Sequence, residues 1–427
     1  MSPRLKTAAL TLLIVVSAIS VLGFGCRRPQ NRVGDSTSQA LVVWGLWQES
    51  ASMDPIVKAF TEQTGIAVEY KKIASVATYE RELLEALAEG RGPDIFVIHH
   101  TWVESKRGIM SPAPAEVINV RQLQDEFVSV VAQDVVRDGF VYALPTSVDT
   151  LALYYNRDLL SGASIARPPR TWQDFQRAAE SITRVSRLGV IEQSAATLGT
   201  ASNVNRAGDI LQLLMIQSGL DIVRGDGRID LANQVAETAL TFYTDFSNKS
   251  KKVYTWDLSQ DFSIDAFAEG ESAMMFNYSH HISTIKAKNP RLNFAIAPVP
   301  QIADSTQVAF ANYWPFAVSP ASQSPTAAWQ FVRFLTDTSV APLINEAQGA
   351  PPARRDNIEA VRSNPELGVF ADQSLIARTW PRVDIVATDT IFNAMIDEVV
   401  TGSITIKDAL RRAQDQLQLL IPNNANI

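Results

Sequence analysis

The stretch ALVVWGLWQESASMDPIVKAFTEQTGIAVEYKKI (residues 40–73) carries the strongest fold signal in the sequence. It opens on apolar and β-branched residues typical of a buried strand. Amphipathic spacing then predicts a helix that ends at Gly65, and a second strand follows. A further helix over residues 78–92 and a third strand over residues 94–100 come next. This alternation predicts right-handed crossovers and a mainly parallel sheet with helices on both faces, the α/β class.

The length of the chain, 427 residues, exceeds what one hydrophobic core usually supports, so we expect two domains or two lobes. With 46% hydrophobic and 19% charged residues, the composition is typical of a globular protein. The formal net charge is -7, and the sequence shows no clustered basic face that would suit a phosphate backbone. We therefore expect no nucleic-acid partner.

The N-terminus has the pattern of an export signal, which we place at residues 1–25. Two basic residues, Arg4 and Lys6, precede an uncharged and mostly apolar run, and Cys26, the only cysteine, follows it. This placement resembles the lipid attachment point of bacterial lipoprotein signals, although Gly23 stands where those signals prefer leucine. Cys26 is therefore our candidate lipidation site.

The polar segment 26–39 has no apolar period and is expected to be a flexible tether. The alternative to lipidation is an uncleaved anchor helix, because the apolar run is nearly long enough to cross ~30 Å of hydrocarbon. Both interpretations place the protein at the outer face of the cytoplasmic membrane or in the periplasm, with a membrane anchor.

Six segments together resemble extracellular solute-binding proteins of the maltose-binding, carbohydrate-uptake type. They occur in the order expected of that family and extend from residue 40 almost to the C-terminus. The segments are LVVWGLWQESASMDPIVKAFTEQTGIAVEY (41–70), GRGPDIFVIH (90–99), YALPTSVDTLALYYNRDLL (142–160), PRTWQDFQRAAESIT (169–183), FAEGESAMMFNYSH (267–280) and GAPPARRD (349–356).

The resemblance implies a two-lobed periplasmic-binding-protein fold, which closes on its ligand like a Venus flytrap. The first lobe would comprise residues 40–147 and 299–350, and the second lobe residues 150–297 and 352–427. The chain would cross from one lobe to the other at the ends of these ranges. Prolines suit such crossings because they interrupt regular elements, and prolines occur near each crossing, at Pro145, Pro298, Pro300, Pro351 and Pro352. The resemblance also implies the permease of an ABC transporter as partner, and we expect the receptor itself to be a monomer.

Polar and aromatic residues gather, by position, at the cleft between the expected lobes. Indole rings stack on the flat faces of sugars, and planar polar groups bind the hydroxyl rim, so the set favours a carbohydrate ligand. The candidate ligand-binding residues are Trp47, Gln48, Glu49, His99, His100, Trp102, Asp149, Asn203, Asn277, Tyr278, His280, Trp314 and Trp380, with Arg206 beside Asn203 in the same loop.

The four histidines of the chain form two adjacent pairs, His99–His100 and His280–His281. Neighbours on a regular strand point to opposite faces, so neither pair could chelate one ion within a strand. Neutral imidazoles that bind a sugar or pack at the cleft wall are one interpretation. The alternative is a metal or anion receptor in which one histidine from each lobe meets the other on closure.

We expect no enzymatic activity, no cofactor and no resident metal. The sequence has neither a GxSxG nucleophile motif nor a lysine-bearing phosphate loop, and nothing marks Glu49 and Asp149 as a catalytic pair. A sensor that passes its closed state to a signalling partner is a further alternative to transport.

Overall fold

The computed structural model describes residues 40–421. The predicted signal peptide, tether and Cys26 therefore lie outside the described residues. Between residues 40 and 421, no helix is both long enough and apolar enough to span a membrane.

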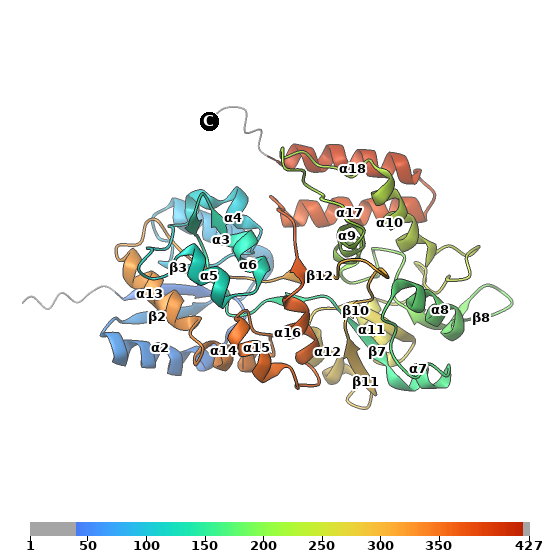
Figure 1. The fold of residues 1–427 in the computed structure, drawn as a ribbon, viewed down its shortest axis with the longest axis horizontal. Coiled ribbons are helices and arrows are strands. Elements are labelled where there is room, and N and C mark those ends of the chain that lie inside the picture. Colours follow the sequence, from blue (N-terminus) through green and yellow to red (C-terminus); the bar gives the residue numbers. More distant parts are fainter. Residues whose placement is uncertain (1–39, 422–427) are drawn as a thin grey trace, which may run out of the picture. The chain divides into compact units, whose positions relative to one another are not determined.

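The sheet of the first lobe has four strands in the order β13-β3-β1-β2. β1 pairs in parallel with both β2 and β3, which confirms the prediction from the opening stretch, whereas β13 runs antiparallel to β3. Figure 1 shows α2 and α3 on opposite sides of this sheet. The elements of this lobe are β1 (Leu41–Gly45), α2 (Ser50–Thr64), β2 (Val68–Lys72), α3 (Val76–Ala88), β3 (Ile95–Val97), α4 (Trp102–Ser105), η1 (Arg107–Ile109), α5 (Val120–Glu126), α6 (Ser129–Val135), β4 (Val136–Arg137), β5 (Phe140–Val141), β13 (Phe316–Val318), α13 (Pro325–Leu335) and α14 (Ala341–Gln348).

The first predicted helix, α2, ends where the sequence indicates. Gly65 takes a left-handed conformation with φ 72°, and its N–H donates to the carbonyl of Thr61 at 2.8 Å. Met53, Ile56 and Phe60 form the buried face of the helix, at the spacing of an amphipathic helix. Local sequence is therefore sufficient to define this element.

The second lobe contains a five-stranded sheet in the order β11-β7-β10-β9-β8. Its elements are β7 (Ala152–Asn156), α7 (Arg157–Gly162), α8 (Trp172–Ile182), β8 (Arg184–Val185), β9 (Ile191–Ala196), α9 (Ala207–Gln217), α10 (Gln234–Asp245), α11 (Ser263–Glu269), β10 (Ser272–Asn277), α12 (His281–Lys288), β11 (Phe294–Ala297), α17 (Ile385–Val400) and α18 (Ile406–Leu420).

This second sheet is mixed rather than mainly parallel, in contrast to the expectation from the sequence. Only β9 and β10 pair in parallel, and the other three pairs are antiparallel. The reason is connectivity. β7 follows directly from residues 149–150, where the chain enters this lobe, and runs away from the connection between the lobes. β10 and β11 are antiparallel to β7 and run back toward that connection. Strands that lead in and out through one entrance must run in opposite directions.

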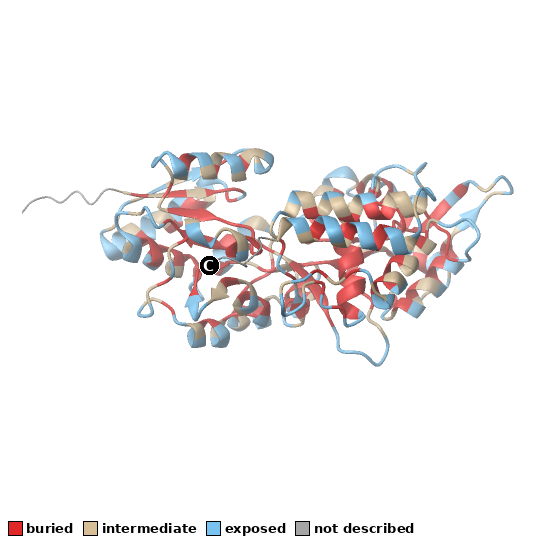
Figure 2. Ribbon diagram, turned by 90° about the horizontal axis from the view of Figure 1, so that it is seen from above, coloured by how far each residue is buried: buried red, intermediate tan, exposed pale blue. Residues whose placement is uncertain are grey.

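Two large hydrophobic clusters form the cores of the lobes. The first-lobe cluster includes Phe96 and Trp329, and the second-lobe cluster includes Trp172, Phe175 and Phe276. Figure 2 shows the buried strands at the centre of each lobe and helices whose outer faces are exposed. Each lobe thus has a core of its own.

A three-stranded sheet, β14-β12-β6, and two helices connect the lobes. Val148 N–H donates to the carbonyl of Pro351, so two of the three predicted crossings lie side by side. The connecting elements are β6 (Asp149–Thr150), β12 (Ala309–Asn312), α15 (Arg355–Val361), α16 (Gly368–Ser374) and β14 (Ala377–Arg378).

The second crossing lies at β12, later in the chain than residues 298–300. Val299 and Phe310 pack in the second-lobe core, whereas Ala311 packs in the first-lobe core. The intervening loop folds back on the second lobe, where the Gln217 side chain donates to the carbonyl of Val308 at 3.0 Å. The prolines at 298 and 300 do not mark this crossing, because the loop that contains them packs on the second lobe alone.

Candidate ligand-binding site

Aromatic side chains of the first lobe gather around Trp314, which follows β12. Its ring centroid lies 5.0 Å from that of Trp47, 5.2 Å from His99 and 5.6 Å from Trp102, each in an edge-to-face arrangement. Trp47 is 42% exposed and Trp314 is partly exposed, whereas Trp102 is 2% exposed. Trp47 and Trp314 therefore offer the accessible aromatic surface, and Trp102 and His99 support it from behind.

The first histidine pair follows β3 but does not continue it as a strand. Because β3 ends at Val97, His99 and His100 are free of strand alternation, and their ring centroids lie only 4.2 Å apart. The expectation that the two rings point to opposite faces is therefore wrong. His100 stacks on Tyr313 at 4.5 Å, and its Nδ1 lies 2.9 Å from Asp134 Oδ2.

Both imidazoles of this pair are neutral at physiological pH. Burial lowers the pKa of His99 well below its usual value, and the nearby positive charges of Arg382 and Arg206 act in the same direction. Burial also lowers the pKa of His100, although the carboxylate of Asp134 opposes that shift. Neutral imidazoles each carry one donor and one acceptor, which suits hydroxyl groups better than anions.

Asp134, on α6, connects the histidine pair to other polar groups. The hydroxyl of Tyr313 donates to Asp134 Oδ2 at 2.7 Å, and the hydroxyl of Thr379 donates to Oδ1 at the same distance. The Asp134 carboxylate therefore binds both Tyr313, whose ring stacks on His100, and Thr379, which lies in the segment after β14. The sequence analysis did not single out Asp134, since a lone acid on a short helix carries no local motif.

The second lobe contributes a charged group around Tyr278, which follows β10. The Tyr278 hydroxyl donates to Asp209 Oδ2 at 2.9 Å, and Arg382 Nη1 donates to Asp209 Oδ1 at 3.3 Å. The guanidinium of Arg206 lies over the Tyr278 ring, 5.3 Å from its centroid. Asp209 and Arg382 are 4% and 1% exposed, so this is a buried ion pair.

Asp149 and His280 lie at the connection between the lobes. Asp149 Oδ2 accepts hydrogen bonds from Ser279 N–H at 2.9 Å and from the Ser279 hydroxyl at 2.8 Å. His280 Nδ1 lies 3.7 Å from the same oxygen, and its side chain is 51% exposed. This histidine is therefore accessible, in contrast to the first pair.

The segment after β14 contacts both lobes within five residues. Toward the first lobe, Thr379 donates to Asp134, and the Val383 carbonyl accepts from the Ser105 hydroxyl at 3.2 Å. Toward the second lobe, Trp380 Nε1 donates to Gln212 Oε1 at 2.6 Å, and Arg382 reaches Asp209. The segment brings the first-lobe histidines near the Arg382 charge.

Four of the predicted ligand-binding residues make their hydrogen bonds or ion pairs within their own lobe. Gln48 accepts from the Tyr70 hydroxyl through its carbonyl at 2.8 Å, and Glu49 pairs with Lys72. The Asn203 side chain bonds Trp256 Nε1 and the backbones of residues 257 and 260, and Asn277 is fully buried with its Oδ1 on its own backbone neighbour. The structure brings Gln48, Glu49 and Asn203 into neither the Trp314 nor the Tyr278 group, whereas Asn277 Oδ1 accepts from the Tyr278 N–H at 3.0 Å.

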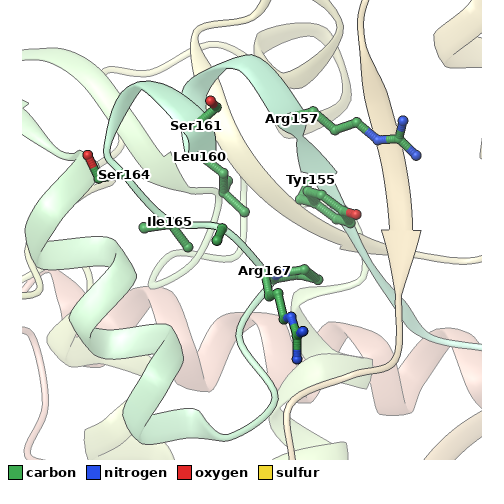
Figure 3. Close-up of a pocket in the computed structure, with 9 residues that line it drawn as sticks. Tyr155, Arg157, Leu160, Ser161, Ser164, Ile165 and Arg167 are labelled. Carbon is green, nitrogen blue, oxygen red and sulfur yellow. The ribbon is translucent and has the colours of Figure 1, made fainter.

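Two adjoining cavities, of about 440 and 370 Å³, lie elsewhere on the second lobe. Figure 3 shows the larger one, where Arg157 and Arg167 extend on either side of Tyr155. Both cavities are lined by the exposed loop between α7 and α8 and by the helices beside it, and neither includes a predicted site residue. We therefore place the candidate site at the Trp314 and Tyr278 groups.

Three acidic or histidine side chains come close enough together to share an ion at one place in residues 40–421. These are Asp261, Glu269 and Glu271, all exposed, and neither histidine pair is part of that group. An exposed acidic group of this kind is common on protein surfaces without a bound ion.

Comparisons with known proteins give the fold and the family. Residues 44–342 match the family described as bacterial extracellular solute-binding proteins. A maltotriose-binding protein of Pyrococcus abyssi is 23% identical over 303 residues, which cover 65% of this chain and 61% of that relative. The match thus spans less than two thirds of that relative.

Solved structures of the same fold cover nearly the whole chain. A cyclo/maltodextrin-binding protein complexed with maltotetraose superimposes with a TM-score of 0.76 at 20% identity, over 91% of this chain and 98% of its own. The sugar-binding protein MalE of Xanthomonas citri gives 0.75 at 19% identity, over 90% and 97%. The fold is therefore the two-lobed α/β fold of these binding proteins, and the chain belongs to the bacterial extracellular solute-binding proteins.

Proposed function

We propose that this chain is the extracytoplasmic receptor of an ABC transporter and that it binds a sugar or oligosaccharide between its lobes. The observation that carries the proposal is the accessible Trp47–Trp314 surface beside neutral histidines. Indole faces stack on sugar rings, and neutral imidazoles and carboxylates bind hydroxyl groups. The names of the relatives, which include maltotriose- and maltodextrin-binding proteins, support the same ligand class.

The lobes would close on the ligand because it contacts both. Trp47 and Trp314 offer first-lobe contacts, and Arg206 and His280 offer contacts from the second lobe and its connection. A ligand favours the closed state by its differential binding energy for that state. Strands β6 and β12 would bend at the hinge.

Membrane tethering and delivery to a permease belong to the same proposal. Cys26 would carry the lipid, and residues 26–39 would link it to the lobes. A Cys26→Ala variant is expected to leave the membrane fraction. Retention of that variant in the membrane would instead support an uncleaved N-terminal anchor.

The Trp47–Trp314 surface is tested by substitution. Trp47→Ala and Trp314→Ala should each weaken saccharide binding about three- to tenfold, since each aromatic contact contributes ~0.5–1.5 kcal/mol. Titration calorimetry would follow a thermal-shift screen of mono- and oligosaccharides that identifies the ligand.

Phe140→Ala is the matched control, because Phe140 is an aromatic residue of the first lobe that is 53% exposed and lies outside the Trp314 group. It should leave the affinity unchanged. If both tryptophan variants bind like the parent chain, the Trp47–Trp314 surface is not the sugar platform.

A further inference from the structure

Arg206 is held in an unusual position at the start of α9. It precedes the helix with φ 64°, a left-handed conformation that is uncommon for a non-glycine residue. Its side chain is partly exposed and lies over the Tyr278 ring. Within residues 40–421 the Arg206 side chain makes no ion pair or hydrogen bond, and its Nε atom is buried without an acceptor.

Arg382 belongs to the same group, because it bonds the Asp209 carboxylate that also accepts from Tyr278, and most of its donors are unused. Its Nη1 is shared between Asp209, at 3.3 Å, and Asp389, at 3.6 Å. Its Nε and Nη2 atoms are buried and have no acceptor among the described residues. A buried donor without an acceptor destabilises the protein, and a charged donor does so more strongly than a neutral one.

The acids around the two arginines do not satisfy these donors. Asp209 already accepts from Tyr278 through one oxygen and from Arg382 through the other. Burial and the Asp209 charge raise the pKa of Asp389 to about 6, so it is mostly a carboxylate at neutral pH, but it reaches only Arg382 Nη1, at 3.6 Å. Gln212 Nε2, one turn along α9, also lacks an acceptor in the described part of the chain. Asp389 Oδ1 is a buried acceptor that also lacks a donor, but the unpaired N–H groups of Arg206, Arg382 and Gln212 outnumber it among the described residues.

Resting on the proposed function, we propose that the bound saccharide carries an oxyanion group that Arg206 binds, with Arg382 as a second cation behind it. A carboxylate, a sulfate ester or a phosphate ester fits, because each presents oxygens that match the planar donor fork of a guanidinium. Trp47 and Trp314 would stack on the sugar ring of the same ligand. Arg206 thus determines specificity for acidic over neutral sugars.

The test compares matched ligands on the purified full chain by thermal shift and titration calorimetry. The probes are glucose, glucuronate, glucose 6-sulfate and glucose 6-phosphate, and galacturonate oligosaccharides against neutral galactose oligosaccharides. At least one oxyanion-bearing member should bind ten- to a hundredfold tighter than its neutral counterpart. The member that does so identifies the anion as carboxylate, sulfate or phosphate.

Substitutions of Arg206 test whether this residue causes the preference for acidic over neutral sugars. Arg206→Gln should bring the ratio of acidic to neutral affinity toward one, and Arg206→Lys should restore part of it. Arg170→Gln is the matched control, because Arg170 is an exposed arginine of the same lobe, and it should keep the parent ratio. Asp389→Asn removes a competing carboxylate and should tighten binding of the oxyanion.

The outcomes separate this inference from the proposed function. Neutral sugars that bind as tightly as their acidic counterparts would overturn the inference and leave the sugar receptor standing. A preference for acidic sugars that persists in Arg206→Gln would also overturn it. If no saccharide of either kind binds, the proposed function itself fails.

Discussion

At the scale of single residues, burial sets the charge of the first histidine pair. His99 is 2% exposed and faces the positive charges of Arg382 and Arg206, so a proton on its ring is strongly disfavoured. Its other polar neighbours include His100, Asn312 and the Thr101 hydroxyl, which lies 2.8 Å from His99 Nδ1. In the unfolded chain the same ring would have its ordinary pKa near ~6.5. Folding therefore expels a proton wherever the pH lies below that value.

This difference predicts a loss of stability in acid. The folded pKa of His99 is lowered, so its contribution is complete above pH ~6.5 and falls as the pH drops below it, by up to ~1.4 kcal/mol per pH unit. His99→Gln should flatten the slope of unfolding free energy against pH between about 5 and 6.5. Urea titrations at several pH values measure that slope.

Equal slopes for the His99 variant and the parent chain would show that His99 does not expel a proton on folding.

At the scale of elements, glycine controls the loop that leads from β9 to α9. Gly199 has φ 123°, and a Cβ atom there would lie 2.6 Å from the backbone nitrogen of Ser247. The carbonyl of Gly199 also accepts from the Ser247 hydroxyl at 3.3 Å. This close approach of two backbones positions the loop that carries Arg206.

We predict that Gly199→Ala destabilises the chain by more than ~2 kcal/mol, because φ strain and a backbone clash combine. Gly65→Ala has a similar conformational cost but open space around its Cβ, so ~1–2 kcal/mol is expected there. Denaturant unfolding of both variants gives the comparison. A smaller loss for Gly199→Ala than for Gly65→Ala would show that the loop relaxes away from Ser247.

At the scale of the whole molecule, the segment from Thr379 to Val383 links the two lobes. Thr379 and Val383 contact the first lobe, while Trp380 and Arg382 contact the second. A movement of one lobe relative to the other would therefore change the hydrogen bonds of this segment. It also connects the His100–Asp134 pair with the Arg382 ion pair, so both halves of the candidate site depend on it.

Thr379→Val should loosen this link, because it leaves one oxygen of Asp134 without its donor, at a cost of about 1–3 kcal/mol. Amide hydrogen exchange should accelerate over residues 377–384, relative to the core strand β10. Thr401→Val, at an exposed position after α17, is the control and should leave this exchange unchanged. Unaltered exchange in Thr379→Val would show that the hydrogen bond does not restrain the segment.

The local elements of the first lobe and the family could be predicted from the sequence alone, because helix periodicity, the glycine stop at Gly65 and the strand runs are short-range features. The sequence also pointed to Trp47, Trp314, His99 and Tyr278, since these follow strand ends or lie in the resembling segments. Which of these residues contact one another depends on the tertiary structure. Asp134, Asp209 and Arg382 join the candidate site through contacts between residues far apart in the chain, and no local pattern encodes such contacts. The antiparallel strands of the second lobe have the same origin, because strand direction there follows from how the chain passes between the lobes.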